Sequence, residues 1–140
     1  MFKMTQEIYR KLTEDGKLKA FTEGNEQASE VWLQFGIKNG GSYRIKFISR
    51  DNDNDVAVRI FGLVSLDGDE QKAKILPVLN SLNNRYRYAK LVMDDDGDVN
   101  MEYDYLMDCP DPTASAMEVV IRFTKLVDDI YPELMRALWA

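Results

Sequence analysis

The chain has 140 residues, of which 45% are hydrophobic and 30% charged, and it carries a net charge of −6. A chain of this length and composition can bury one hydrophobic core, so we predict one globular domain over residues 1–140. The acidic balance argues against a nucleic-acid partner, because such proteins present an excess of Lys and Arg to phosphate. The absence of histidine excludes His-dependent catalytic triads and dyads and imidazole metal sites.

Hydropathy and cysteine content bear on location. No apolar run approaches the roughly 20 residues that a membrane helix needs, and the N-terminal segment lacks the apolar core of a secretory signal. Cys109 is the only cysteine, so an intrachain disulfide is excluded, and the neighbouring Asp108 and Asp111 disfavour a reactive thiolate. We therefore expect a cytoplasmic protein that contacts no membrane.

Residues 3–15 are expected to form an amphipathic helix. Apolar residues recur every four positions from Met4 to Leu12, and Gly16 follows where the helix can end. Residues 18–22 form a short extended candidate before a polar loop.

From residue 30 the apolar period changes to two on both sides of residues 39–41, Asn-Gly-Gly, which indicates a hairpin. A loop of two or four residues would set apolar side chains against basic ones, so we predict a three-residue loop. The facing pairs are then Ile37 and Tyr43, Phe35 and Ile45, and Leu33 and Phe47.

The third expected strand, residues 56–64, is apolar on both faces, as in an interior strand. A turn and a helix follow within residues 65–86, with Asp67 or Asp69 as the cap. The buried stripe of this helix comprises Ile75, Leu79 and Leu82. Pro77 either kinks the helix or begins its main segment, because proline lacks the amide hydrogen.

A second hairpin turns within residues 92–100, VMDDDGDVN. With Asp95, Asp96 and Gly97 as a three-residue loop, the glycine takes the left-handed conformation that it tolerates best. The facing pairs are then Met93 and Val99, Leu91 and Met101, Ala89 and Tyr103, and the opposite charges Lys90 and Glu102.

Calcium binding is the alternative for this acidic run. With Gly97 at the sixth position of an EF-hand loop, Val92 and Tyr103 occupy the first and twelfth positions, where calcium needs oxygen ligands. The flanking segments also have the period of strands instead of helices. The run DNDND, residues 51–55, is equally typical of a turn. We assign no metal site and no cofactor, and a divalent-metal protein remains a distant alternative.

The last helix begins near Thr113, is rich in apolar residues and is interrupted by Pro132. The expected order is therefore αβββαββα. Consecutive hairpins make an antiparallel sheet of about five strands, and we expect the helices to pack on one face of it, an α+β fold.

The predicted register also exposes one face of the first hairpin. The side chains on that face are Trp32, Gln34, Arg44, Lys46 and Ile48, and Arg59 and Phe61 join them if the third strand continues the register. A basic and aromatic patch on an acidic protein suits a partner with acidic and apolar groups. Two alternatives stay open: the basic stems cover the aromatic rings, or a dimer buries the surface.

Four further residues are assigned structural roles: Asn80, Asn83, Gly97 and Pro132. Asn80 and Asn83 lie one turn apart near a helix end, where their amides can cap the last carbonyls and bond the following strand. Neighbouring carboxylates such as Asp128 and Asp129 diverge on one helix without any sign of a pocket, so we expect no catalytic residue.

Residues 75–106, ILPVLNSLNNRYRYAKLVMDDDGDVNMEYDYL, and residues 127–139, VDDIYPELMRALW, carry a family resemblance. A helix that ends in a paired Leu-Asn motif, followed by a strand, an acidic glycine turn and a strand, resembles the YbjN-domain proteins. Those proteins share the fold of type III secretion chaperones. The expected order αβββαββα is also the order of that fold, so the resemblance covers nearly the whole chain.

The resemblance implies a small cytoplasmic homodimer that binds another protein and is not an enzyme. It carries over no catalytic residue. We therefore predict a chaperone-like, adaptor or regulatory module whose partner is a protein or peptide segment. The alternative is a sensor or signal-transduction domain that binds a small ligand between sheet and helices.

Overall fold

The computed structural model describes residues 2–25, 27–38, 40–50, 55–106 and 112–139. This part of the chain forms three helices and six strands. In chain order they are α1 (Lys3–Thr13), β1 (Phe21–Gly24), β2 (Ser29–Gly36), β3 (Ser42–Ser49), β4 (Asp55–Ser65), α2 (Gly68–Arg85), β5 (Lys90–Met93), β6 (Asp98–Leu106) and α3 (Pro112–Trp139).

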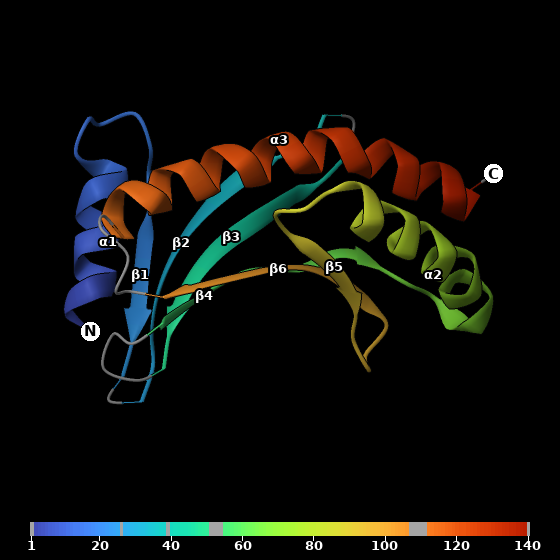
Figure 1. The fold of residues 1–140 in the computed structure, drawn as a ribbon, viewed down its shortest axis with the longest axis horizontal. Coiled ribbons are helices and arrows are strands. Elements are labelled where there is room, and N and C mark those ends of the chain that lie inside the picture. Colours follow the sequence, from blue (N-terminus) through green and yellow to red (C-terminus); the bar gives the residue numbers. More distant parts are fainter. Residues whose placement is uncertain (1, 26, 39, 51–54, 107–111, 140) are drawn as a thin grey trace.

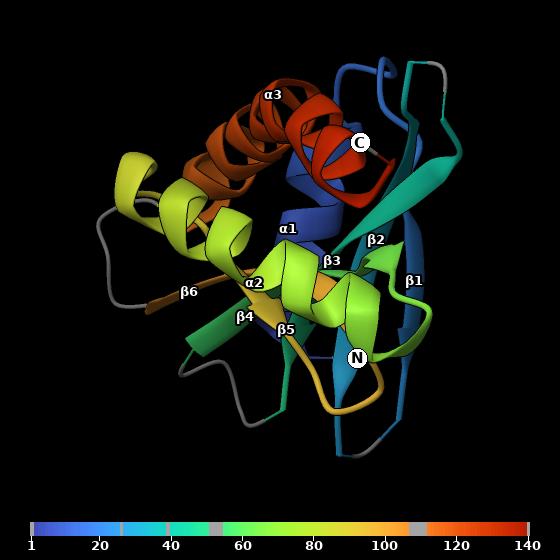
Figure 2. The same ribbon diagram turned by 90° about the vertical axis from the view of Figure 1, so that its right-hand side faces the viewer.

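The strands form an antiparallel sheet in the order β1-β2-β3-β4-β6-β5. The three helices lie on one face of this sheet, with α3 running across it between α1 and α2 (Figures 1 and 2). The predicted α+β class is therefore confirmed. The sheet has six strands instead of about five, because β1 pairs with β2 where only a short extended stretch was expected.

The core lies between the helices and the inner face of the sheet. Alternation along β2 buries Val31 and Leu33 there. Helix α3 supplies a large share of its buried residues, which are Ala116, Val119, Val120, Phe123, Leu126, Val127, Ile130, Leu134 and Leu138. Since burying one large apolar side chain contributes about 1.5–3 kcal/mol, this helix is a principal source of the fold's stability. The large hydrophobic residues of its described part that are exposed are Ile121 and Trp139.

The hairpin of β2 and β3 is shifted by two residues from the prediction. Phe35 faces Tyr43 and Leu33 faces Ile45, so the three-residue loop and its facing pairs are wrong. Ile37 belongs to the turn instead, where its N–H donates to the carbonyl of Gly41 at 2.9 Å. A shift of two leaves every side chain on its predicted face, because side chains alternate with period two. Residue 39 of the predicted loop lies outside the described residues.

The hairpin of β5 and β6 has the predicted register. Met93 faces Val99, Leu91 faces Met101 and Lys90 faces Glu102, which are the pairs predicted from the sequence. The Gly97 N–H donates to the carbonyl of Asp94 at 3.1 Å, and Gly97 has a φ of 82°. The left-handed glycine therefore closes the loop as expected.

Helices α2 and α3 both continue through a proline. Pro77 lies inside α2, whose buried stripe is the predicted one of Ile75, Leu79 and Leu82. Asp67 occupies the N-cap position, but its side chain makes no capping bond, and its N–H donates to Gln71 Oε1 at 2.7 Å instead. The predicted interruption at Pro132 is wrong: α3 is continuous, and Pro132 is exposed where water can satisfy the carbonyl that a proline leaves unpaired. None of the helices in the described ranges has both the length and the apolarity to cross a membrane.

Candidate functional site

The outer patch consists of the six residues predicted on the open sheet face: Trp32, Arg44, Lys46, Ile48, Arg59 and Phe61. The register brings them together, because Lys46 on β3 faces both Trp32 on β2 and Arg59 on β4. Phe61 follows Arg59 by two positions on β4 and is 53% exposed. Since the three helices pack on the opposite face, no described helix covers the patch (Figures 1 and 2).

An aromatic stack extends the outer patch to the edge strand β1. The rings of Phe21 and Trp32 lie 4.3 Å apart between centroids at an interplanar angle of 18°. The Arg44 guanidinium sits 4.0 Å from the centroid of the Trp32 ring, and Lys19 Nζ sits 5.3 Å from that of Phe21. Sequence reasoning missed Phe21, because a four-residue edge strand has no periodic signal of its own. The stack gives the patch a flat, partly exposed aromatic surface with a cation on it.

Most of the positive charge in the outer patch is neutralised locally. Lys46 Nζ lies 3.5 Å from a carboxylate oxygen of Glu30, and Arg59 pairs with Glu102 and Asp104 on β6. Arg44, by contrast, forms no ion pair with any described residue. The alternative in which basic side chains cover the aromatic rings describes Arg44, which lies over Trp32, and Lys46, 6.0 Å from the centroid of the Phe61 ring. The partner-binding interpretation concentrates on Arg44, which has no ion pair with a described residue, and on the exposed rings.

The half-buried Ile48 completes the outer patch. It faces Glu30 on β2 and Ala57 on β4, between the charged positions. Its side chain adds apolar surface beside Lys46 without extending the aromatic stack.

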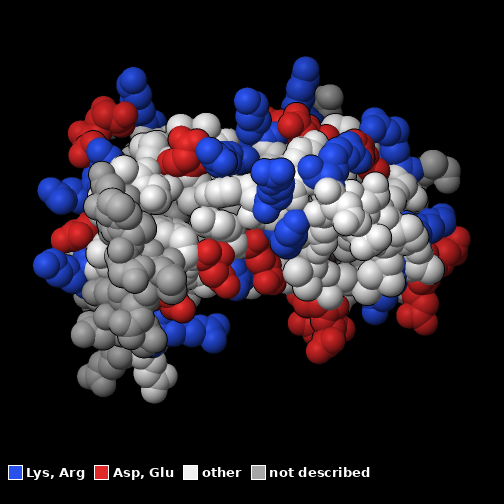
Figure 3. Space-filling view, in the orientation of Figure 1, with Lys and Arg blue, Asp and Glu red and all other residues white. Residues whose placement is uncertain are grey.

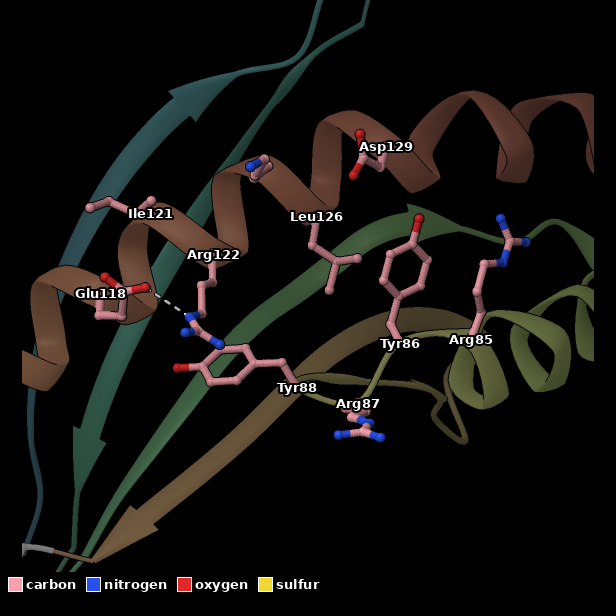
Figure 4. A pocket seen from close by; sticks show the side chains of 10 residues that line it. Arg85, Tyr86, Arg87, Tyr88, Glu118, Ile121, Arg122, Leu126 and Asp129 are labelled. Carbon is pink, nitrogen blue, oxygen red and sulfur yellow. Dashed lines mark hydrogen bonds and ion pairs between the residues drawn. The ribbon is translucent and has the colours of Figure 1, made fainter.

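A pocket of about 530 Å³ lies on the helical side of the molecule, between α3 and the connection from α2 to β5. Figure 4 shows its side chains, and Figure 3 shows Lys and Arg side chains gathered over this part of the surface. We call it the arginine-tyrosine pocket after the residues that dominate its lining, Arg85, Tyr86, Arg87, Tyr88 and Arg122, with Lys125 beside them.

One wall of the arginine-tyrosine pocket is a fixed aromatic ring. Tyr88 stacks on Tyr103 with centroids 4.4 Å apart and meets Phe123 edge-on at 6.2 Å. Burial raises the pKa of the Tyr88 phenol well above its ordinary value, and Tyr103 adds to the rise, so the hydroxyl keeps its proton near neutral pH. The Arg122 guanidinium lies 5.0 Å from the Tyr88 ring centroid, and its Nε donates to Glu118 at 2.9 Å.

The other end of the pocket is closed by an ion pair between α2 and α3. Arg85 donates from its two terminal nitrogens to the two carboxylate oxygens of Glu133, each at 2.8 Å. These bonds lower the pKa of Glu133 and raise that of Arg85. Sequence reasoning missed this pocket, because its two halves, residues 85–88 and 118–129, lie at least thirty positions apart and each alone is an ordinary polar surface. The one local signal was the alternating RYRY of residues 85–88.

The acidic turn is held by its own hydrogen bonds. Asp94 Oδ1 accepts the N–H groups of Asp96 at 2.9 Å and Asp98 at 3.0 Å, and Asp94 Oδ2 accepts the Asn100 amide at 2.9 Å. These bonds, those of Asp98 and Asn100 foremost, lower the pKa of Asp94. Buried Asn100 in turn accepts the Gly62 N–H at 2.8 Å, at the irregularity in β4.

This arrangement accounts for the acidic turn without an ion. Within the described ranges, no three His, Cys, Asp or Glu side chains are grouped so as to hold a metal. Residues 51–54 of the second acidic run lie outside those ranges.

The two candidate structural asparagines differ. Asn83 clamps α2 to β5: its Nδ2 donates to the Leu91 carbonyl at 2.9 Å, and its Oδ1 accepts the Leu91 N–H at 2.8 Å. Asn80 is exposed and contributes its backbone carbonyl, which accepts the Asn84 side-chain amide at 2.9 Å. The paired Leu-Asn motif therefore acts through its second asparagine.

Comparison with protein families bears on both surfaces. The YbjN family model, described as "Putative bacterial sensory transduction regulator", matches residues 34–135. The chain belongs to the YbjN family. No curated protein and no solved structure matches it.

The YbjN match includes every residue of the arginine-tyrosine pocket and most of the outer patch. It begins after Phe21 and Trp32, so the aromatic stack at β1 lies outside the matched region. The match also includes the Asn83 clamp and the acidic turn, which are the motifs on which the resemblance rests.

Proposed function

We propose that this YbjN protein is a non-enzymatic regulatory or adaptor module that binds another protein through the outer patch. The observation that carries the proposal is the stack of the exposed Phe21 and Arg44 on the half-buried Trp32, beside the exposed Phe61, on a sheet face that no described helix covers. Exposed aromatic rings with an arginine are the side chains most enriched where binding energy concentrates in protein interfaces.

The chemistry of the outer patch favours a partner segment that carries both acidic and apolar side chains. Arg44 offers its guanidinium N–H groups to a carboxylate without first breaking an ion pair with a described residue. Phe21 and Phe61, 38% and 53% exposed, offer apolar contact on either side of it. The family description, "Putative bacterial sensory transduction regulator", supports a regulatory role. The cytoplasmic location and the absence of catalysis belong to the proposal.

The test is affinity capture from the native host with quantitative mass spectrometry. The bait carries either the natural sequence, the double change Trp32→Ala with Arg44→Glu, or the control change Tyr9→Ala with Arg10→Glu. The control alters an exposed aromatic residue and an arginine on α1, away from the patch. We expect at least one protein to bind the natural and control baits and to be lost from the patch variant. If the patch variant retains every partner, the outer patch is not the binding surface.

We also propose that the protein acts as a homodimer with the fold of type III secretion chaperones. Both rest on the resemblance of residues 75–106 and 127–139 and on the order of helices and strands, to which β1 is an addition. The many apolar residues of α3 give little support for a dimer, because most of them are buried in the chain's own core. Light scattering at roughly tens of micromolar, the range for a modest interface, should give twice the mass of the chain, and a monomer would contradict the proposal.

A further inference from the structure

We propose that the arginine-tyrosine pocket binds a small organic anion whose charged group is joined to an apolar or aromatic body. The pocket is formed by α3 and the connection from α2 to β5, on the face of the sheet opposite the outer patch. The two candidate sites therefore share no residue, and this inference does not rest on protein capture by the outer patch.

Positive charge at the pocket exceeds what its acidic neighbours neutralise. Arg85 and Arg122 are each paired with a glutamate, whereas Arg87 and Lys125 form no ion pair with a residue of the described part. One lining carboxylate, Asp129, is likewise unpaired there. Four cationic side chains line the pocket against three carboxylates when Glu133 is counted, so the local balance is positive by one charge on a chain whose net charge is −6. A local excess of positive charge favours an anionic ligand.

Arg122 is oriented to receive the anion. Its Nε is held by Glu118 and its plane lies over the Tyr88 ring, while its terminal nitrogens donate to no described residue. Figure 4 shows this guanidinium reaching from α3 towards the α2–β5 connection. A planar guanidinium with free N–H groups recognises carboxylate or phosphate through two parallel hydrogen bonds.

The rest of the pocket lining favours a ligand with an apolar body. Tyr86 and Tyr88 present aromatic rings, and Leu126 and the 52% exposed Ile121 present aliphatic surface from α3. A bare inorganic ion would leave these groups in contact with water. The volume of about 530 Å³ falls in the range of roughly 300–1,000 Å³ that small-molecule sites occupy, which favours a small molecule over a macromolecule.

Titration of the ¹⁵N-labelled protein with phenyl phosphate, followed by NMR, tests this inference. We expect saturable shifts confined to the amides of residues 85–88 and 118–129. Inorganic phosphate, which lacks the ring, and benzyl alcohol, which lacks the charge, should each bind at least about tenfold more weakly. Equal binding of all three probes, or shifts spread over the whole surface, would overturn the inference.

Charge reversal at Lys125 supplies the matched variant. Lys125→Glu should weaken phenyl phosphate binding by at least about tenfold, and Lys125→Arg should restore it. Lys17→Glu, an equal charge change on the exposed connection between α1 and β1, should leave binding unchanged. Equal losses of phenyl phosphate affinity in Lys125→Glu and Lys17→Glu would show that only net charge matters and would overturn the proposed site. The double change Trp32→Ala with Arg44→Glu should still bind the probe, which separates failure here from failure of the outer patch.

Discussion

The two hairpins of the sheet were predicted from the same kind of pattern, yet one has the predicted register and the other is shifted by two residues. In the hairpin of β5 and β6, a left-handed glycine and the Asp94 carboxylate fix which residues form the loop. In the hairpin of β2 and β3, Asn-Gly-Gly offers several permissive positions, and the loop extends to include Ile37. Alternation fixes the face of each side chain, whereas turn chemistry fixes its partner.

This difference has a functional side. The outer patch depends only on which face a residue occupies, so the shift by two leaves its members on the predicted face. The shift does change their neighbours, and Trp32 faces Lys46 instead of Ile48. The contacts between cations and rings in the outer patch depend on the observed register. The membership of the patch depends only on the two-residue alternation along each strand.

The largest expected effect concerns the clamp that joins α2 to the second hairpin. Asn83→Ala removes two hydrogen bonds to Leu91 and should lower the free energy of unfolding by about 2–3 kcal/mol. Asn80→Ala, an equal truncation on the exposed side of the same helix, should change it by less than about 0.5 kcal/mol. Urea unfolding of both variants measures the contrast. Equal losses would mean that the motif acts through helix propensity and not through the clamp.

Gly97 and Gly41 compare the turns of the two hairpins directly. Gly97→Ala forces a side chain into the left-handed region and places Cβ 3.1 Å from Lys72 Cε, so we expect a loss of about 1–2 kcal/mol. Gly41 has open space around the position of a Cβ and no positive φ, so Gly41→Ala should cost less than about 0.5 kcal/mol. Thermal and urea unfolding give both values. A comparable loss in Gly41→Ala would show that the first turn is as strictly determined as the second.

How far the sequence predicts this fold depends on the range of the interaction involved. Hydrophobic periodicity and turn residues are local signals, and they predicted the α+β class, the buried stripe of α2 and the register of the second hairpin. Only a short extended stretch over residues 18–22 was predicted near β1, because the four residues of this strand are held by pairing with β2. The continuity of α3 through Pro132 was not predicted, because burial along the helix outweighs one lost hydrogen bond.

The candidate sites divide in the same way. The outer patch was predicted because its residues share the faces of consecutive strands. The arginine-tyrosine pocket joins residues 85–88 to α3, and only the packing of the helices brings them together. The partner of Trp32 in the aromatic stack, Phe21, likewise depends on a pairing that has no local signature.

The acidic turn should also give a smaller, pH-dependent effect. Hydrogen bonds lower the pKa of Asp94 below its ordinary 3.8, so its contribution to stability is complete above that pH and is lost as the pH falls through the lower, folded-state value. Between about pH 6 and pH 3 the natural protein should therefore lose more stability than Asp94→Asn, which cannot titrate at this position. Urea unfolding at both pH values measures the difference.

Asp95→Asn is the control, because its carboxylate accepts no hydrogen bond from the described part of the turn, and it should follow the natural protein. Glu133, whose pKa is also lowered, titrates in every variant and cancels in the comparison. If the stability of Asp94→Asn depends on pH as that of the natural protein does, the Asp94 carboxylate does not stabilise this turn.

The smallest effect tests the observed register of the first hairpin. Glu30 and Lys46, each about a quarter exposed, form an ion pair on the outer face, because Glu30 faces Ile48 and Ile48 is two residues along β3 from Lys46. A double-mutant cycle with Glu30→Gln and Lys46→Gln should give a coupling of about 0.2–1 kcal/mol that shrinks in high salt. The register first predicted sets Ile48 against Trp32 and moves Lys46 away from Glu30, so it requires no coupling. A measurable, salt-sensitive value therefore distinguishes two pairings that bury the same side chains.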